Sequence, residues 1–136
     1  MRRETPYPGG LEAARAYGRQ SIDKAAGQAR LRYITEAPGQ QLTYQRKSDE
    51  VDRWETTPEE ERVEAAFRMI FASARAYGET PELAYARIKA SRDLWTIAGA
   101  TIEEMREAGK RAVDAAGTVQ EAIAASRTAI ASLEEV

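Results

Sequence analysis

Four carboxylates lie close together in the stretch SDEVDRWE, which spans residues 48–55. Paired carboxylates can act as general acid and base in glycoside hydrolysis, and groups of them can bind divalent metal ions. The spacing here lacks the alternating ligands and the central glycine of a calcium loop. On a helix, these side chains would spread over a solvent-facing surface beside the basic segment QRK. We therefore interpret the group as solvated surface charge; its members are Asp49, Glu50, Asp52 and Glu55.

The chain contains no cysteine and no histidine. Disulfides, thiolate zinc sites, cysteine nucleophiles and a Ser-His-Asp triad are therefore excluded. No glycine-rich phosphate loop of the Walker or dinucleotide type occurs. We expect a protein that is not an enzyme and that binds no cofactor and no metal. The alternative is a carboxylate-dependent hydrolase, in which Asp49, Glu50 or Asp52 would be essential for turnover.

Charge is distributed unevenly along the chain. Residues 1–47 hold nine Lys and Arg against four Asp and Glu, whereas residues 48–136 hold eleven against eighteen. This asymmetry could drive head-to-tail association or docking on a partner; chance asymmetry on a solvated surface is the alternative. Tyrosines alternate with the basic residues, as in some nucleic-acid-binding surfaces. The pI near 5.4 argues against that partner. The set comprises Arg15, Arg19, Lys24, Arg30, Arg32, Arg46 and Lys47 with Tyr17, Tyr33 and Tyr44.

The composition predicts an all-α protein with a thin core. The chain has 136 residues, of which 43% are hydrophobic, and much of that fraction is alanine, which favours helix but fills little volume. Some apolar surface is therefore expected to be covered by a partner or by self-association, and we expect a homo-oligomer. No apolar run is long enough to span a membrane, and no secretory signal is recognisable at the N-terminus.

Proline, glycine and capping residues divide the chain into helices. An extended arm is expected over residues 1–10, then a helical hairpin over residues 11–55, then a compact bundle of about four short helices over residues 56–136, with all three parts in one structural unit. Within the hairpin, the first helix is expected over residues 11–35 and the second over residues 41–54. The periodicity predicts one apolar face on the first helix, made by Ile22, Ala25, Ala26, Ala29 and Tyr33. The bundle helices are expected to begin at the capping residues Thr57, Thr80, Thr101 and Thr118 and to end at Gly78, Gly99 and Gly117.

The segment ITEAPGQQLTY is the most specific local feature. Pro38 disfavours helix at the residue before it, and Gly39 permits a positive φ. Gln40 can cap the incoming helix or bond back to the outgoing one. The segment therefore predicts a corner, with Tyr33 and Tyr44 packing across it, rather than an active site.

Both tryptophans lie at helical spacing from other apolar residues. Trp54 is expected on the apolar side of the second helix, and Trp95 is expected to face inward with Leu94. Core packing is the favoured interpretation for both side chains, and a role at an interface is the alternative.

The segment SIDKAAGQARLRYITEAPGQQLTYQRKSDEVDRW resembles a segment found in small helical proteins of tailed bacteriophages. Its recognisable pattern is R-Y-I-T-x-x-P-G-Q-x-x-x-Y-x-x-K. A second similarity is the pattern I-E-x-x-R-x-x-x-K, here Ile102, Glu103, Arg106 and Lys110. The resemblance covers about residues 20–130, and such proteins are typically encoded near tail or tail-fibre genes. It brings no catalytic residue with it.

The resemblance implies a structural or accessory component of a phage virion that contacts other tail or fibre proteins. It would be assembled in the host cytoplasm and retained in the particle. The alternative is a tail-fibre assembly chaperone that leaves after folding. In either case the candidate structural and interface residues are those of the corner and the two tryptophans: Tyr33, Pro38, Gly39, Gln40, Tyr44, Trp54 and Trp95.

Overall fold

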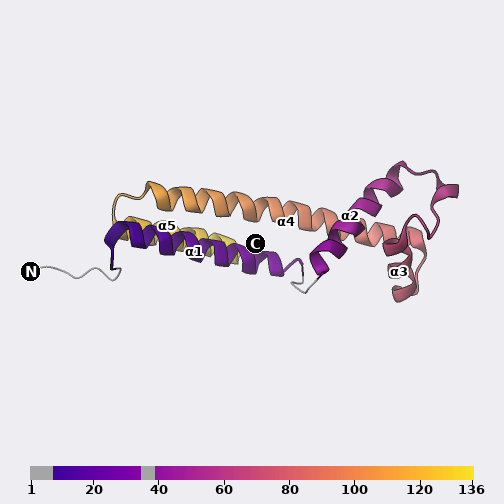
Figure 1. Cartoon of the computed structure of the whole chain (residues 1–136), viewed down its shortest axis with the longest axis horizontal. Coiled ribbons are helices and arrows are strands. Elements are labelled where there is room, and N and C mark those ends of the chain that lie inside the picture. The colour runs from indigo at the N-terminus through magenta and orange to yellow at the C-terminus, as the bar shows by residue number, and fades with distance from the viewer. Residues whose placement is uncertain (1–7, 35–38) are drawn as a thin grey trace, which may run out of the picture. The chain divides into compact units, whose positions relative to one another are not determined.

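The computed structural model describes residues 8–34 and 39–136, and every regular element in these two ranges is a helix. The prediction of an all-α protein is confirmed. Figure 1 shows the elements in chain order. They are α1 (Gly10–Leu31), α2 (Gln40–Thr56), the 3₁₀ helix η1 (Glu59–Glu61), α3 (Arg68–Tyr77), α4 (Pro81–Ala115) and α5 (Val119–Glu134).

The helices form two compact units that cut across the predicted boundaries. Unit 1 comprises Met1–Tyr33 and Ala98–Val136, and unit 2 comprises Ile34–Ile97. The long helix α4 contributes its C-terminal part to unit 1 and its N-terminal part to unit 2. The predicted division into a hairpin over 11–55 and a bundle over 56–136 is therefore not how the contacts group the chain. Residues 1–7 of the predicted arm lie outside the described residues.

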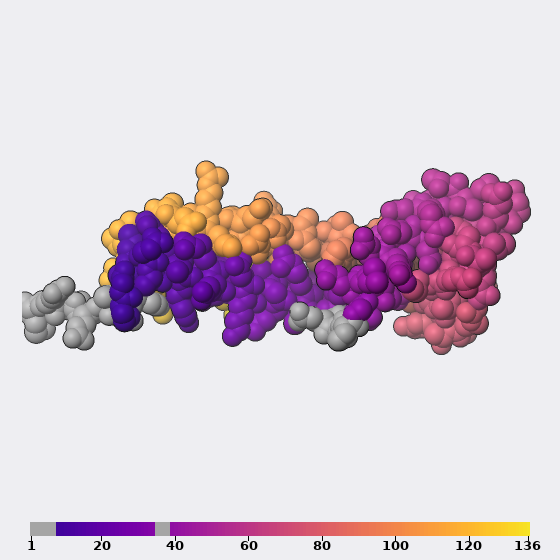
Figure 2. All heavy atoms as spheres, in the orientation of Figure 1, coloured from indigo at the N-terminus to yellow at the C-terminus, as the bar shows by residue number. Residues whose placement is uncertain are grey.

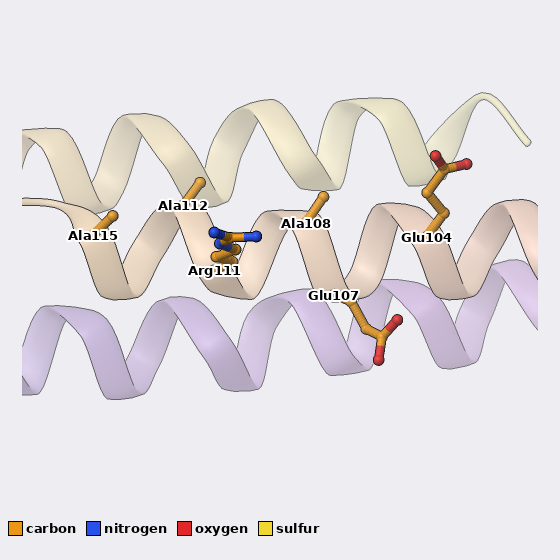
Figure 3. A pocket seen from close by; sticks show the side chains of 6 residues that line it. All are labelled: Glu104, Glu107, Ala108, Arg111, Ala112 and Ala115. Carbon is orange, nitrogen blue, oxygen red and sulfur yellow. The ribbon is translucent and has the colours of Figure 1, made fainter.

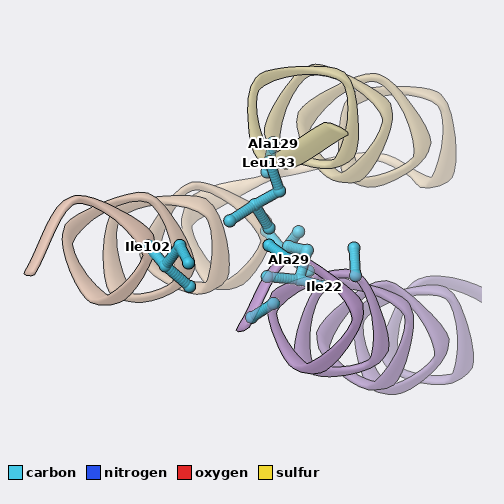
Figure 4. Close-up of a cluster of buried hydrophobic side chains, with 8 residues drawn as sticks. Ile22, Ala29, Ile102, Ala129 and Leu133 are labelled. Atoms are coloured by element: carbon cyan, nitrogen blue, oxygen red, sulfur yellow. The ribbon is translucent and has the colours of Figure 1, made fainter. Parts of the chain in front are cut away.

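Unit 1 is built around the face of α1 that its periodicity predicted. Helices α1 and α5 pack against each other, and α4 completes the core between them (Figure 4). Ile22 of α1, Ile102 of α4 and Leu133 of α5 are fully buried in this core. Smaller residues fill the remaining space: Ala25, Ala26, Ala29, Val113 and Ala129.

Two glycines of unit 1 lie where helices approach one another closely. A Cβ added at Gly109 of α4 would lie 2.5 Å from the Cβ of Ala129 and 3.3 Å from the Cδ1 of Ile22. A Cβ added at Gly18 of α1 would lie 3.2 Å from Val113. By contrast, Gly27 of α1 has no heavy atom within 4 Å of such a position. The first two glycines therefore permit close packing, whereas Gly27 is not required by a close contact.

Unit 2 has a separate core that is richer in aromatic side chains. Trp54 of α2 is only 2% exposed, so the prediction that it packs in the core is confirmed. Its ring lies edge-on to Phe67, with centroids 5.1 Å apart, and is stacked with Tyr85 at 5.2 Å. Val51 and Ile70 are fully buried beside it.

Two of the four predicted N-caps are confirmed. The hydroxyl of Thr118 accepts a hydrogen bond from the backbone N–H of Glu121 at 3.1 Å. Likewise, Thr80 accepts from the N–H of Leu83 at 3.2 Å, immediately before α4 begins at Pro81. These side chains satisfy donors that a helix N-terminus leaves without an intrahelical partner.

The other two predicted N-caps are wrong. Thr57 instead donates its hydroxyl to the carbonyl of Arg53 at the end of α2, and α3 begins only at Arg68. At Thr101 no helix begins, because α4 runs without a break through Gly99. One glycine in the interior of a helix costs only about 1 kcal/mol relative to alanine. Burial of Ala98 and Ile102 on either side outweighs that cost.

We predict opposite effects for two glycine-to-alanine substitutions in unit 1. Gly109→Ala should destabilise the protein by about 1–3 kcal/mol, because its Cβ would overlap that of Ala129. Gly27→Ala should stabilise it by about 0.5–1 kcal/mol, because it removes backbone entropy from the unfolded chain without a clash. Urea unfolding of the two variants measures both changes. Equal effects would contradict the close approach at Gly109.

Candidate functional site

The residues of the predicted corner lie at the ends of α1 and α2. Gly39 has a φ of 80°, as predicted, and α2 begins at Gln40. Tyr33 is partly buried against the unit 1 core, and the ring centroid of Tyr44 lies 5.9 Å from the ammonium of Lys47. Pro38 lies outside the described residues. Packing of the two tyrosines across the corner stays a prediction.

The prediction that Leu94 and Trp95 face inward is wrong. Leu94 is 59% exposed and Trp95 is 40% exposed, and Ile97 beside them is 68% exposed. The inward face of α4 in this region is carried instead by Ala84 and Ile88. Leu94, Trp95 and Ile97 thus place three large apolar side chains at the surface within one helical turn, and we call them the α4 apolar patch.

The acidic stretch of residues 49–55 does not form a shared site. The carboxylate of Asp52 pairs with Arg92, and that of Glu55 accepts a hydrogen bond from the hydroxyl of Tyr85 at 2.9 Å. Asp49 is exposed, in keeping with the interpretation as surface charge. For Glu50 the interpretation as solvated surface charge is wrong, because its side chain is only 7% exposed.

Glu50 caps helix α3 from a different helix. Both of its carboxylate oxygens accept a hydrogen bond from the backbone N–H of Met69 at 3.0 Å, and one also accepts from Ile70 at 3.1 Å. These two residues are in the first turn of α3, where the helix dipole favours a negative charge. The residue at the N-cap position of α3 is Phe67, whose side chain cannot accept a hydrogen bond, so the cap comes from Glu50 of α2. Sequence spacing alone does not reveal such a long-range cap.

A network of ion pairs joins α1 to α4 in unit 1. Asp23 and Arg30 of α1 face three residues of the I-E-x-x-R-x-x-x-K pattern. Arg30 is 2.8 Å from Glu103, Arg106 is 2.6 Å from Glu103 and 3.0 Å from Asp23, and Lys110 is 3.0 Å from Asp23. The isoleucine of the same pattern, Ile102, is fully buried in the core. The pattern therefore has a role in packing within this chain.

The network lowers the pKa of its two carboxylates, Asp23 and Glu103. Hydrogen bonds from Lys110 and Arg106 lower the pKa of Asp23, although partial burial opposes this effect. A hydrogen bond from Arg106 lowers the pKa of Glu103 in the same way, helped by the nearby charge of Arg30. Both carboxylates therefore favour the charged form more strongly in the folded chain than in the unfolded one.

Most of the predicted basic surface of α1 is used inside unit 1. Arg15 donates to the carbonyl of Ala116 at 2.6 Å, just past the C-terminus of α4. Arg32 donates to the carbonyl of Leu133 at 2.6 Å, in the last turn of α5. Arg19 pairs with Asp114. Cations at these positions satisfy terminal carbonyls and complement the helix dipole. Much of the charge asymmetry between the two parts of the chain is thus matched within the chain.

Comparison with family models, with curated proteins and with solved structures found no match to this chain. Within residues 8–34 and 39–136, no three acidic side chains are grouped closely enough to hold a metal ion. In the same ranges, no helix combines the length and the apolar character needed to cross a membrane.

We predict that removing the Glu50 cap destabilises unit 2. Glu50→Ala should cost about 1–3 kcal/mol, because the buried N–H of Ile70 and the partly buried N–H of Met69 would lose their acceptor. Glu50→Gln should cost less, since it keeps one acceptor oxygen. Glu60→Ala is the matched control, because Glu60 is exposed and should change stability by less than about 0.5 kcal/mol. Urea unfolding measures all three variants. A larger effect at Glu60 would instead favour the capping box expected at Thr57.

We also predict a loss of stability in acid that depends on the α1–α4 network. The lowered pKa values of Asp23 and Glu103 contribute stability above their unfolded values of 3.8 and 4.5. That contribution should disappear as the pH falls through and below this window. The double variant Asp23→Asn/Glu103→Gln should therefore lose less stability between pH 6 and pH 3 than the natural chain.

Urea unfolding at several pH values provides the measurement for this acid dependence. Glu134→Gln serves as the control, because Glu134 is exposed and forms no ion pair within the described part of the chain. If the double variant and the natural chain lose the same stability in acid, the network does not contribute in the way described.

Proposed function

We propose that this chain is a non-enzymatic structural or accessory component of a phage virion, associated with the tail or the tail fibre. It acts through helix-mediated protein–protein contacts. The phage setting is supported by the resemblance over about residues 20–130. The mode of action is supported by the α4 apolar patch.

The α4 apolar patch carries the proposal. Large apolar side chains scattered singly over a surface are normal, whereas grouped ones mark sites of protein contact. On one turn of α4, Leu94 lies between Ile97 and Trp95, so that the three side chains together span nearly half of the helix circumference. Leu83 on the same helix is 58% exposed. Leu83 and Leu94 are eleven residues apart, close to three full turns, so they lie on the same side of α4. Tryptophan is also among the residues most enriched at the centres of interfaces.

The interactions of the ionisable side chains are consistent with a protein that acts through protein–protein contacts. Asp52, Glu55 and Glu50 bind three different partners, and the arginines of α1 bind helix ends and carboxylates. These interactions hold helices together. A tail-fibre assembly chaperone, which would use the same patch only transiently, is the second candidate.

Mass spectrometry of purified particles of the encoding phage tests the proposal. We expect the chain in the particle at a reproducible stoichiometry. The variant Leu94→Ala/Trp95→Ala should reduce its incorporation about tenfold or more, because it removes the centre of the patch. Leu31→Ala is the matched control, since Leu31 is an exposed leucine of unit 1 outside the patch.

The outcome separates the two candidates. Absence from the particle, together with capture of a fibre protein from infected cells by the natural chain but not by the double variant, would replace the virion component with the chaperone. Absence from the particle without such capture would contradict both.

A further inference from the structure

A shallow groove runs between α4 and α5 on unit 1. It has a volume of about 410 Å³ and is lined mainly by small residues, with Ala108 and Ala112 on α4 and Ala124 and Thr128 on α5. The close-up of this side of α4 shows Ala108 and Ala112 directed toward α5, whereas Glu107 points toward α1 (Figure 3). Small side chains let a further helix approach closely, as a fourth helix does in a bundle.

Two opposite charges flank the groove on its α4 side. Glu104 and Arg111 line an open surface together with Ala108 and Ala115, and both are exposed. Neither forms a hydrogen bond or an ion pair within the described part of the chain, although the neighbouring Glu103, Arg106 and Lys110 all do. In the space-filling view, the orange surface of α4 is open to solvent above the indigo residues of α1 (Figure 2).

The spacing of these two charges suits a partner with the same sequence. Seven residues bring Glu104 and Arg111 to nearly the same side of the helix, about 10 Å apart along its axis. That separation is too long for a direct ion pair within one helix. If two copies of α4 pack antiparallel about a two-fold axis at Ala108, however, Glu104 of each copy lies opposite Ala112 of the other, one residue (about 1.5 Å along the axis) from Arg111. The same register places Ala108 beside Ala108 at the centre and Met105 opposite Arg111, one residue from Ala112.

We propose that a second copy of this chain docks in this groove, with the two α4 helices antiparallel across Ala108. The two-fold contact is isologous, so one complementary pair of charges forms two ion pairs. The α4 and α5 helices of both copies then make a four-helix layer. This inference rests on the proposed function, because it identifies a second copy of the chain as one partner in the helix-mediated contacts proposed above.

Sedimentation equilibrium of the full-length chain tests the docking. We expect a reversible dimer. Glu104→Arg and Arg111→Glu should each weaken dimerisation on the order of tenfold, because both ion pairs become repulsive contacts. The double variant Glu104→Arg/Arg111→Glu should restore dimerisation, because the two charges have only exchanged places. Ala108→Trp should abolish it, because a large side chain prevents the close approach.

Two controls keep the result specific. Lys24→Glu changes an exposed charge on α1, away from the groove, and should leave dimerisation unchanged. Circular dichroism of each variant shows whether unit 1 remains helical. A chain that is monomeric at every concentration, or a dimer that tolerates Ala108→Trp and is not rescued by the charge exchange, would overturn the inference. A monomer that is nevertheless recovered in phage particles would overturn this inference alone and leave the proposed function standing.

Discussion

The close approach of three helices at small residues is the constraint on which unit 1 depends. Its core holds few large side chains, so α1, α4 and α5 must come near one another before any of them is well covered. Gly109 makes this possible, because even a methyl group there would overlap Ala129. Alanines on α1 fill the rest of the contact. The core of unit 1 is therefore close-packed although most of its side chains are small, because the helix surfaces fit closely together.

Charged groups reinforce this packing. Arg15 and Arg32 lie at the C-terminal ends of α4 and α5, where terminal carbonyls need donors. Asp23 lies between Arg106 and Lys110, so that α1 is attached to α4 along its side as well as near the helix ends. Exposed ion pairs are individually weak, but each of these also fixes the register of one helix against the next.

Unit 2 is stabilised by a different kind of interaction. Its aromatic cluster around Trp54 buries more volume per residue than the alanines of unit 1. The buried carboxylate of Glu50 also accepts hydrogen bonds from the first turn of α3 and so caps that helix. One helix, α4, serves both units. The α4 apolar patch lies on the part of α4 that belongs to unit 2.

Local features of the chain were sufficient to predict the helical class, the buried face of α1, the caps at Thr80 and Thr118 and the positive φ of Gly39. Each of these depends on residues within one or two turns of each other, so periodicity and turn chemistry reveal them. The I-E-x-x-R-x-x-x-K pattern was visible, but its ion pairs with Asp23 of α1 were not, because more than 80 residues separate the partners.

By itself, the sequence determined that the chain is helical, which face of α1 is apolar and which catalytic chemistries are impossible without histidine and cysteine. Only the tertiary structure decided that α4 continues through Gly99, that α3 begins at Arg68 and that Trp95 is exposed while Trp54 is buried. The physical reason is that these outcomes depend on burial and hydrogen bonding against distant segments. Such terms exceed the local preference of a single glycine or threonine and leave no mark in the neighbouring sequence.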